Sequence, residues 1–146
     1  MKYLGIDYGD SRSGIAVSDA GGKIAFKLCV VDGKAGRKKV AENIVKIFNE
    51  QQAEKIVIGY PLNMDGSKGE RIKITEKFAK ILKETFENKG LNCPEIIFKD
   101  ERLTTKMADK AMIEMNVRQS RKGVSDELAA IFILQNYLDE ISRRAE

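Results

Sequence analysis

The chain has 146 residues, with 26 Lys and Arg against 22 Asp and Glu, a formal net charge of +4 and no histidine. Without histidine, Ser–His and Cys–His catalysis and histidine-containing zinc sites are excluded. Acid–base or metal chemistry must then use carboxylates, lysine, tyrosine or bound water. The two cysteines, Cys29 and Cys93, lack metal-ligand spacing and are too few to staple a chain of this length.

We expect neither a membrane anchor nor a secretion signal in this chain. No apolar run approaches the ~20 residues that span a bilayer. The N-terminal "MKYLGIDYG" reaches a glycine and an aspartate too early for a signal peptide. At this length we expect one domain, residues 1–146, in the cytoplasm.

The first third of the chain predicts three strands. Residues 2–8, 13–19 and 23–31 are short apolar or alternating runs, separated by "GDSR" and "AGG". Glycine and small polar residues of this kind form tight turns. Because the connections are short, the strands are expected to pair as an antiparallel three-stranded meander.

The hydrophobic period changes after residue 36. Val40, Ile44, Ile47 and Phe48 share one helical face. The rest of the chain predicts a helix over 37–51, a strand over 55–61, a helix marked by Ile74 to Phe86, a strand over 95–100, and helices over 105–116 and from Asp126 onward. This order predicts an α/β fold whose five-stranded mixed sheet has two parallel strands after the meander and helices on both faces.

Acidic residues fall where strands end. Asp7 closes the first strand, Asp100 and Glu101 close the fifth, and Asp126 opens the last helix. In open α/β sheets, ligands bind at the carboxyl ends of strands. If these acids met, their repulsion would favour a bound divalent cation, and carboxylate oxygens suit Mg²⁺ or Mn²⁺. Such ions can activate water against a phosphodiester.

Each acid also has a purely structural interpretation. Asp is favoured at the first position of a turn, which would account for Asp7. Asp100 and Glu101 could be solvated loop charges. Ser125 is a good helix N-cap, and an acid just after it complements the helix dipole, which would account for Asp126. The sequence suggests that the acids converge, and it leaves these alternatives open.

Four motifs in this chain resemble one protein family. They are "GIDYGDSRSGIAVSD" (5–19), "IVIGYPLNMDGSKGER" (56–71), "DERLTT" (100–105) and "KGVSDELAAIFILQNYL" (122–138). Together they resemble the YqgF/RuvX family of Holliday junction resolvase-like proteins, usually described as nucleases that mature the 5′ end of pre-16S rRNA. The resemblance implies an RNase H-like fold. It also implies that Asp7, Glu101 and Asp126 are catalytic and bind one or two Mg²⁺ or Mn²⁺ ions, with Asp100 in a supporting role.

Other motif positions are candidates for contacting nucleic acid. Arg12 lies in the first hairpin turn, and Asn63 and Arg71 belong to the loop after the fourth strand, which by analogy overhangs the site. Arg71 could grip a phosphate or pair with Glu70 or Glu76. The full set of candidates is Arg12, Asn63, Arg71, Arg102, Arg118, Arg121 and Lys122. Their structural alternative is ordinary solvated surface.

The sequence leaves several functions open. A nuclease acting on structured RNA, above all pre-16S rRNA, either free or in a ribosomal particle, is favoured over a DNA junction resolvase. A resolvase should be a two-fold dimer, and one core accounts for every amphipathic helix, so we expect a monomer or weak dimer. A third alternative is a non-catalytic nucleic-acid-binding factor in transcription or ribosome assembly. The first hairpin also resembles that of the sugar kinase and actin superfamily, whose members need two such domains to enclose ATP.

Overall fold

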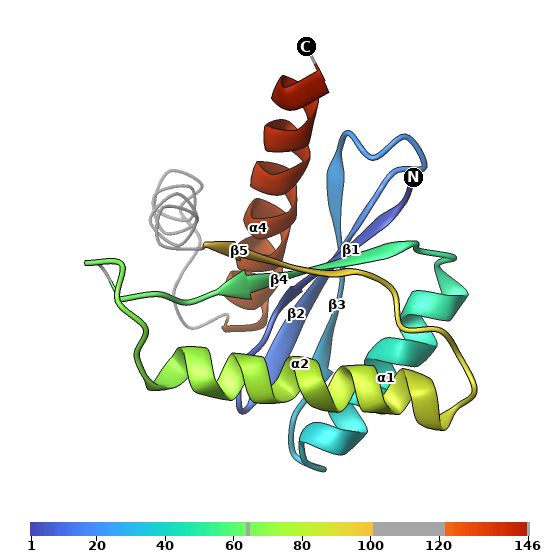
Figure 1. Ribbon diagram of the computed structural model, residues 1–146, viewed down its shortest axis with the longest axis vertical. Coiled ribbons are helices and arrows are strands. Elements are labelled where there is room, and N and C mark those ends of the chain that lie inside the picture. Colours follow the sequence, from blue (N-terminus) through green and yellow to red (C-terminus); the bar gives the residue numbers. More distant parts are fainter. Residues whose placement is uncertain (64, 101–121, 146) are drawn as a thin grey trace.

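The computed structural model describes residues 1–63, 65–100 and 122–145, and its strands form one mixed sheet (Figure 1). The strands are β1 (Tyr3–Asp7), β2 (Arg12–Ser18), β3 (Ala25–Asp32), β4 (Lys55–Tyr60) and β5 (Ile96–Asp100). The helices are α1 (Arg37–Glu50), α2 (Glu70–Asn88) and α4 (Lys122–Ala145). The helix predicted over 105–116 lies outside the described residues.

The sheet has the predicted topology. Its strand order is β3-β2-β1-β4-β5. The first three strands pair antiparallel, and β1 pairs with β4 and β4 with β5 in parallel. Parallel pairing requires a long crossover between strands, and α1 and α2 supply these crossovers. The predicted meander followed by two parallel strands is confirmed.

Helices cover both faces of the sheet (Figure 1). The face toward α1 and α2 carries the larger core, in which Ile6 of β1 and Ile58 of β4 pack with Phe78 of α2. The other face carries a smaller core formed with α4, in which Tyr3 and Val57 pack with Leu134. Alternate residues of β1 and β4 therefore serve the two cores, as the period of two in a strand requires.

Gly5 allows α4 to lie close to β1. A Cβ atom at this position would be 2.7 Å from the Cβ of Leu134 and 3.3 Å from the carbonyl oxygen of Ala130. Both neighbours belong to the helix backbone or to its first side-chain atom, so they cannot simply rotate away. The missing side chain of Gly5 therefore sets the separation between the sheet and α4.

We expect Gly5→Ala to lower the free energy of unfolding by about 1–3 kcal/mol, because overpacking a fitted core has this effect. Urea denaturation of the two proteins would measure the difference. Gly90→Ala serves as the steric control, since nothing lies within 4 Å of a Cβ there, although its φ of +72° adds local strain. A Gly5→Ala protein as stable as the wild type would show that α4 does not depend on this contact.

The last helix begins earlier than predicted. It starts at Lys122, so Ser125 is not its N-cap and Asp126 lies just beyond the first turn. Gly123 within this turn has a helix cost of about 1 kcal/mol relative to alanine, which the rest of the helix offsets. An N-cap preference is a local signal, and here the longer helix overrides it. None of the helices in the described part is both long and apolar enough to cross a membrane.

Candidate active site at the carboxyl edge of the sheet

Asp7 is the last residue of β1 and lies at the edge of the sheet where the parallel strands end. In β2 it pairs with Gly14. In β4 the register Ile6↔Ile58 brings Gly59 next to it on the other side. Across β2, β1 and β4, the neighbouring residues at this level are Gly14, Asp7 and Gly59. The carboxylate of Asp7 therefore has a glycine on each side.

Asp7 belongs to the face of the sheet that α4 covers. Tyr3 packs in the α4 core, and its ring meets that of Tyr137 at a centroid distance of 5.8 Å. Because strand side chains alternate, Tyr3, Gly5 and Asp7 share this face. The structural alternative, in which Asp7 serves only the following turn, does not explain why two glycines flank it on this face.

The direction of α4 carries its N-terminal part toward Asp7. Tyr137, in the C-terminal half of the helix, contacts Tyr3 at the start of β1, whereas the Ala130 carbonyl lies over Gly5 in the middle of that strand. The helix therefore runs antiparallel to β1. Asp126 is four residues before Ala130, about 6 Å along the helix axis. The backbone at Asp126 thus lies toward the end of β1 that carries Asp7.

Asp100 lies on the other face of the sheet. Lys99, the residue before it, reaches across the α4 face to Glu140 at 2.9 Å. By alternation Asp100 belongs to the opposite face with its register partner Tyr60, whose hydroxyl donates to Glu76 of α2 at 3.1 Å. The sheet therefore separates Asp100 from Asp7, and a supporting role for Asp100 stays a prediction.

The predicted metal site can be tested only at one of its three acids. Glu101 lies outside the described residues, and for Asp126 the structure describes the backbone. Among residues 1–63, 65–100 and 127–144, no three His, Cys, Asp or Glu side chains are grouped so that they could hold a metal ion. The donor chemistry fits nonetheless, because three carboxylates supply the hard oxygen ligands that Mg²⁺ and Mn²⁺ prefer.

The turn after Asp7 is packed against both helices of the opposite face. The Tyr8 ring is 7% exposed and stacks on Phe78 of α2, with centroids 4.0 Å apart and planes 15° apart. Burial raises the pKa of the Tyr8 phenol, although the guanidinium of Arg37 beside it opposes this shift. Tyr8 therefore keeps its proton near neutral pH and cannot serve as a base.

Arg71 lies in the first turn of α2 and not in the loop before it. Its Nη1 donates to the Asp10 carboxylate at 3.1 Å, and its Nη2 donates to the Tyr8 carbonyl oxygen at 3.0 Å. The alternative partners predicted for Arg71, Glu70 and Glu76, were wrong: its guanidinium binds the β1–β2 turn instead. Glu76 accepts a hydrogen bond from the Tyr60 hydroxyl at 3.1 Å. Sequence reasoning missed Asp10, whose only signal was its place beside the first motif's glycines.

The other predicted nucleic-acid contacts are only partly described. Arg12 begins β2 and lies opposite Asp32 of β3. Asn63 makes its contacts within its own loop. Its side-chain NH₂ group donates to the Ser67 hydroxyl at 3.0 Å, and its backbone carbonyl accepts from the Gly66 amide at 2.8 Å. Lys122 begins α4, and its side chain is not described. Three further candidates lie outside the described residues: Arg102, Arg118 and Arg121.

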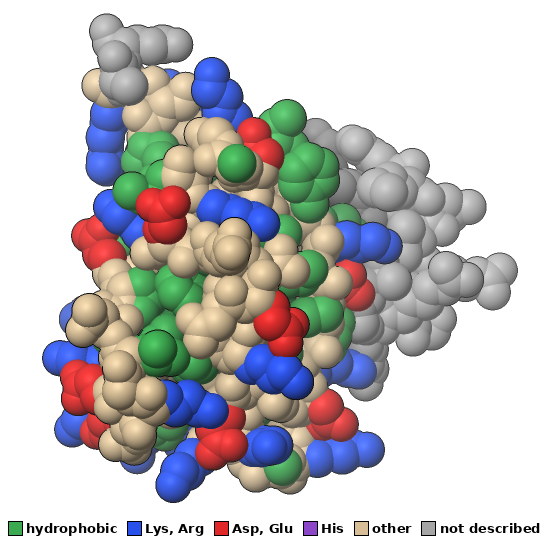
Figure 2. Space-filling model, turned by 90° about the vertical axis from the view of Figure 1, so that its right-hand side faces the viewer, with side chains coloured by type: hydrophobic (Ala, Val, Ile, Leu, Met, Phe, Trp, Pro, Cys, Tyr) green, Lys and Arg blue, Asp and Glu red, His purple; other side chains and the backbone are tan. Residues whose placement is uncertain are grey.

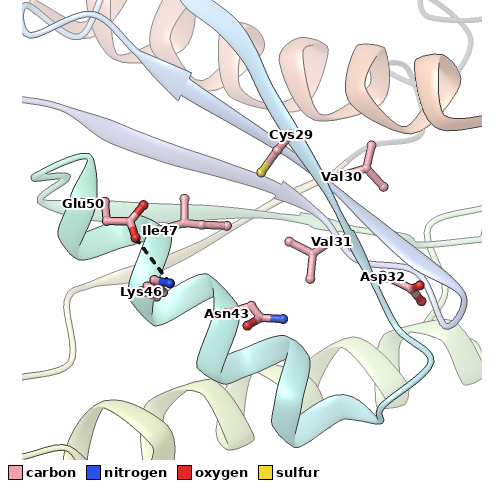
Figure 3. A pocket seen from close by; sticks show the side chains of 8 residues that line it. All are labelled: Cys29, Val30, Val31, Asp32, Asn43, Lys46, Ile47 and Glu50. Carbon is pink, nitrogen blue, oxygen red and sulfur yellow. Dashed lines mark ion pairs between the residues drawn. The ribbon is translucent and has the colours of Figure 1, made fainter.

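The cavity in Figure 3 lies away from Asp7, between β3 and α1. It has a volume of about 310 Å³ and is crossed by an ion pair between Lys46 and Glu50 at 3.9 Å. Burial raises the pKa of the Cys29 thiol in its wall, and Glu127 adds to this effect. The thiol is therefore protonated near neutral pH, and the cavity holds no predicted site residue.

Charge alone does not mark a binding path on the face in Figure 2. Lys and Arg side chains there are interspersed with Asp and Glu side chains over the described residues. The candidate site is defined by position: it is the carboxyl edge of β1, toward which the first turns of α4 are directed.

These features define the class of protein. A mixed sheet in the order β3-β2-β1-β4-β5, with an aspartate ending β1 and a helix running antiparallel across it, is an RNase H-like fold. Solved structures share this fold. RuvC of T. thermophilus in complex with a Holliday junction substrate aligns with a TM-score of 0.58 at 16% identity, covering 99% of this chain and 96% of that one. The yeast mitochondrial Holliday junction resolvase Ydc2 aligns with a TM-score of 0.54 at 11% identity, covering 93% and 77%.

The chain belongs to the RuvX family, because the family model described as "RuvX: Holliday junction resolvase" matches residues 1–140. A relative from Ruminiclostridium cellulolyticum, named "Putative pre-16S rRNA nuclease", is 44% identical over 143 residues, or 97% of this chain and 96% of the relative. A relative of the same name from Clostridium beijerinckii is 43% identical over 145 residues, covering 99% and 100%. The family resemblance of the four motifs is thus confirmed.

Proposed function

We propose that this chain is a metal-dependent endonuclease that hydrolyses phosphodiester bonds in structured nucleic acid, and that its substrate is the 5′ end of pre-16S rRNA. The observation that carries the proposal is Asp7 at the carboxyl end of β1, with glycines on both sides and the first turns of α4 directed toward it. The name shared by the relatives supports the RNA substrate.

Asp7, Glu101 and Asp126 would hold one or two Mg²⁺ or Mn²⁺ ions. When bound, such ions supply Lewis-acid chemistry that activates water and stabilises the leaving oxygen of a phosphodiester. The chain's own contribution is to hold the carboxylates in place. Gly14 and Gly59 leave the flanks of Asp7 without side chains, so a sugar–phosphate chain can approach it. From the end of β5, Asp100 would support the site only indirectly, because its side chain belongs to the face of the sheet opposite Asp7.

The substrate would be held by polar and basic side chains around this edge. The residues assigned to this role are Arg12, Asn63, Arg102, Arg118, Arg121 and Lys122. Lys and Arg side chains neutralise phosphates without reading sequence, so these contacts supply affinity more than specificity. We assign the whole chain, 1–146, to one nuclease domain that acts in the cytoplasm as a monomer or weak dimer, on the ribosomal precursor itself or on a ribosomal particle.

Cleavage of DNA junctions is the second candidate, because the family description names a Holliday junction resolvase. The two candidates differ in what they require of the protein. A resolvase cuts two strands and needs two sites related by two-fold symmetry. An RNA-processing nuclease needs one. A binding factor without catalysis would use the same basic residues and would not depend on Asp7.

The test compares two substrates in one assay. The protein is incubated with an RNA carrying the precursor 5′ extension of 16S rRNA and with a four-way DNA junction, each with Mg²⁺, with Mn²⁺ and with excess chelator. We expect cleavage of the RNA with either ion and none with chelator. Cleavage of the junction alone would favour the resolvase. Binding without cleavage of either substrate would leave only the binding factor.

A further inference from the structure

The β1–β2 turn that follows Asp7 is held by an arginine from a distant part of the chain. Arg71 of α2 spans 63 residues of sequence to reach Tyr8 and 61 to reach Asp10. Its two terminal nitrogens serve different partners, the Asp10 carboxylate at 3.1 Å and the Tyr8 backbone carbonyl at 3.0 Å. The carbonyl belongs to the residue directly after Asp7, so the guanidinium fixes the peptide next to the predicted metal ligand.

The same turn is also held by the loop between β3 and α1. The Gly33 amide, in the loop between β3 and α1, donates to the Ser11 carbonyl at 2.9 Å. A Cβ atom at Gly33 would lie 2.4 Å from the carbonyl oxygen of Asp10, so only glycine allows this approach. Within the turn, the Gly9 amide donates to the Ser13 hydroxyl at 3.3 Å. The turn is thus held both by the loop at Gly33 and by the guanidinium of Arg71. We call these two sets of contacts the clamp.

Such a clamp matters because a metal-binding carboxylate must be held to within about 0.5 Å of its productive position. The β-ladder fixes the backbone of Asp7 on its N-terminal side through Ile6 and Ile58. On its C-terminal side the chain leaves the sheet, and Asp10 and Ser11 are exposed. There, Arg71 holds the backbone through its hydrogen bonds to the Tyr8 carbonyl and the Asp10 carboxylate.

We propose that Arg71 is a positioning residue for Asp7, acting through Tyr8 and Asp10, and that it does not contact the phosphates of the substrate. This inference rests on the proposed function, because it assigns Arg71 a role toward the metal site. Arg71 is assigned this positioning role because both of its terminal nitrogens are already bound, Nη1 to the Asp10 carboxylate and Nη2 to the Tyr8 backbone carbonyl. A phosphate would have to displace Asp10 from an ion pair that already satisfies the same donor.

The experiment measures Mn²⁺ binding to the full chain by calorimetry in the absence of nucleic acid, and separately the salt dependence of RNA binding without metal. The variants are Arg71→Ala, Arg71→Lys and Asp10→Asn. Lys80→Ala is the matched control, because it removes one positive charge from an exposed position on the same helix. Circular dichroism confirms that each variant is folded.

We expect Arg71→Ala and Asp10→Asn to weaken Mn²⁺ binding about 10- to 100-fold, the range found when a residue that orients a metal ligand is removed. Arg71→Lys should resemble Arg71→Ala, since an ammonium group cannot form the two-sided fork. The slope of log K against log salt for RNA should be unchanged in all of them, and Lys80→Ala should match the wild type in Mn²⁺ affinity.

Asp10→Asn separates the two roles most sharply. If Arg71 were a phosphate contact, this variant would release it and strengthen RNA binding, while Arg71→Ala would reduce the salt slope by about one. That pair of results with unchanged Mn²⁺ affinity would overturn the proposal.

If the wild type bound no Mn²⁺, the proposed metal site would fail by itself. In that case, amide hydrogen exchange at Gly9 would test whether Arg71 holds the turn. Faster exchange in Arg71→Ala than in the wild type would support this role, and an unchanged rate would refute it.

Discussion

Replacing Asp7 with asparagine should reduce RNA cleavage by at least about 100-fold and leave the protein folded. Asparagine keeps the shape of the side chain and the register with Gly14, so the sheet has no reason to change. It removes a charge that the ion requires. Loss of a residue that only orients a ligand already reduces metal affinity or activity 10- to 100-fold, and loss of the ligand itself should reduce it at least as much.

The measurement is single-turnover cleavage of the precursor RNA at saturating Mg²⁺, with thermal unfolding run in parallel. Glu84→Gln is the control, because it neutralises one exposed carboxylate on α2. We expect the control to cleave like the wild type and both variants to unfold near the wild-type temperature. Undiminished cleavage by Asp7→Asn would remove the metal-site proposal, whatever the substrate.

Phe78→Ala should lower the free energy of unfolding by about 3–5 kcal/mol, the range for deleting a fully buried phenylalanine. Phe78 is 0% exposed and belongs to the larger core. Its ring also stacks on Tyr8, so the substitution leaves a cavity directly beneath the residue that follows Asp7. Stability is measured by urea denaturation, with the midpoint and slope fitted for each protein.

Phe98→Ala provides the matched comparison. Phe98 is also an aromatic residue of the sheet, on β5, but it is 40% exposed and stands at the edge strand. Removing it leaves no closed cavity, so we expect a loss of less than about 1.5 kcal/mol. Equal losses for the two variants would show that Phe78 does not occupy the core position assigned to it.

The strands and their pairing could be predicted because the evidence for them is local. Alternating apolar residues around Ile6 and Ile15, short glycine-containing turns, and helical spacing between strands are all signals within a dozen residues. The beginning of α4 was harder to predict. Ser125 is a good N-cap in isolation, yet the helix extends to Lys122, because local capping preferences are small beside the stability of a long helix packed on a sheet.

The candidate site was predictable only in part. Asp7 could be proposed from its place at the end of a strand. The face that it occupies followed only from the structure, because the packing of Tyr3 and Gly5 against α4 decides it. The same alternation places Asp100 on the opposite face. The partners of Arg71 could not be read from the sequence, since Asp10 lies 61 residues away and Glu70 and Glu76 were the nearer acids.

By itself, the amino-acid sequence determined the order of the strands and helices in the described part of the chain and the family. It also determined the absence of histidine, which leaves acid–base or metal chemistry to carboxylates, lysine, tyrosine or bound water. The tertiary structure decided which side chains share a face and which distant segments meet. The physical reason is the separation in sequence over which each kind of interaction acts. Hydrophobic period and turn preference act between near neighbours, whereas the approach of α4 at Gly5 and the reach of Arg71 to the turn after Asp7 exist only once the sheet has formed.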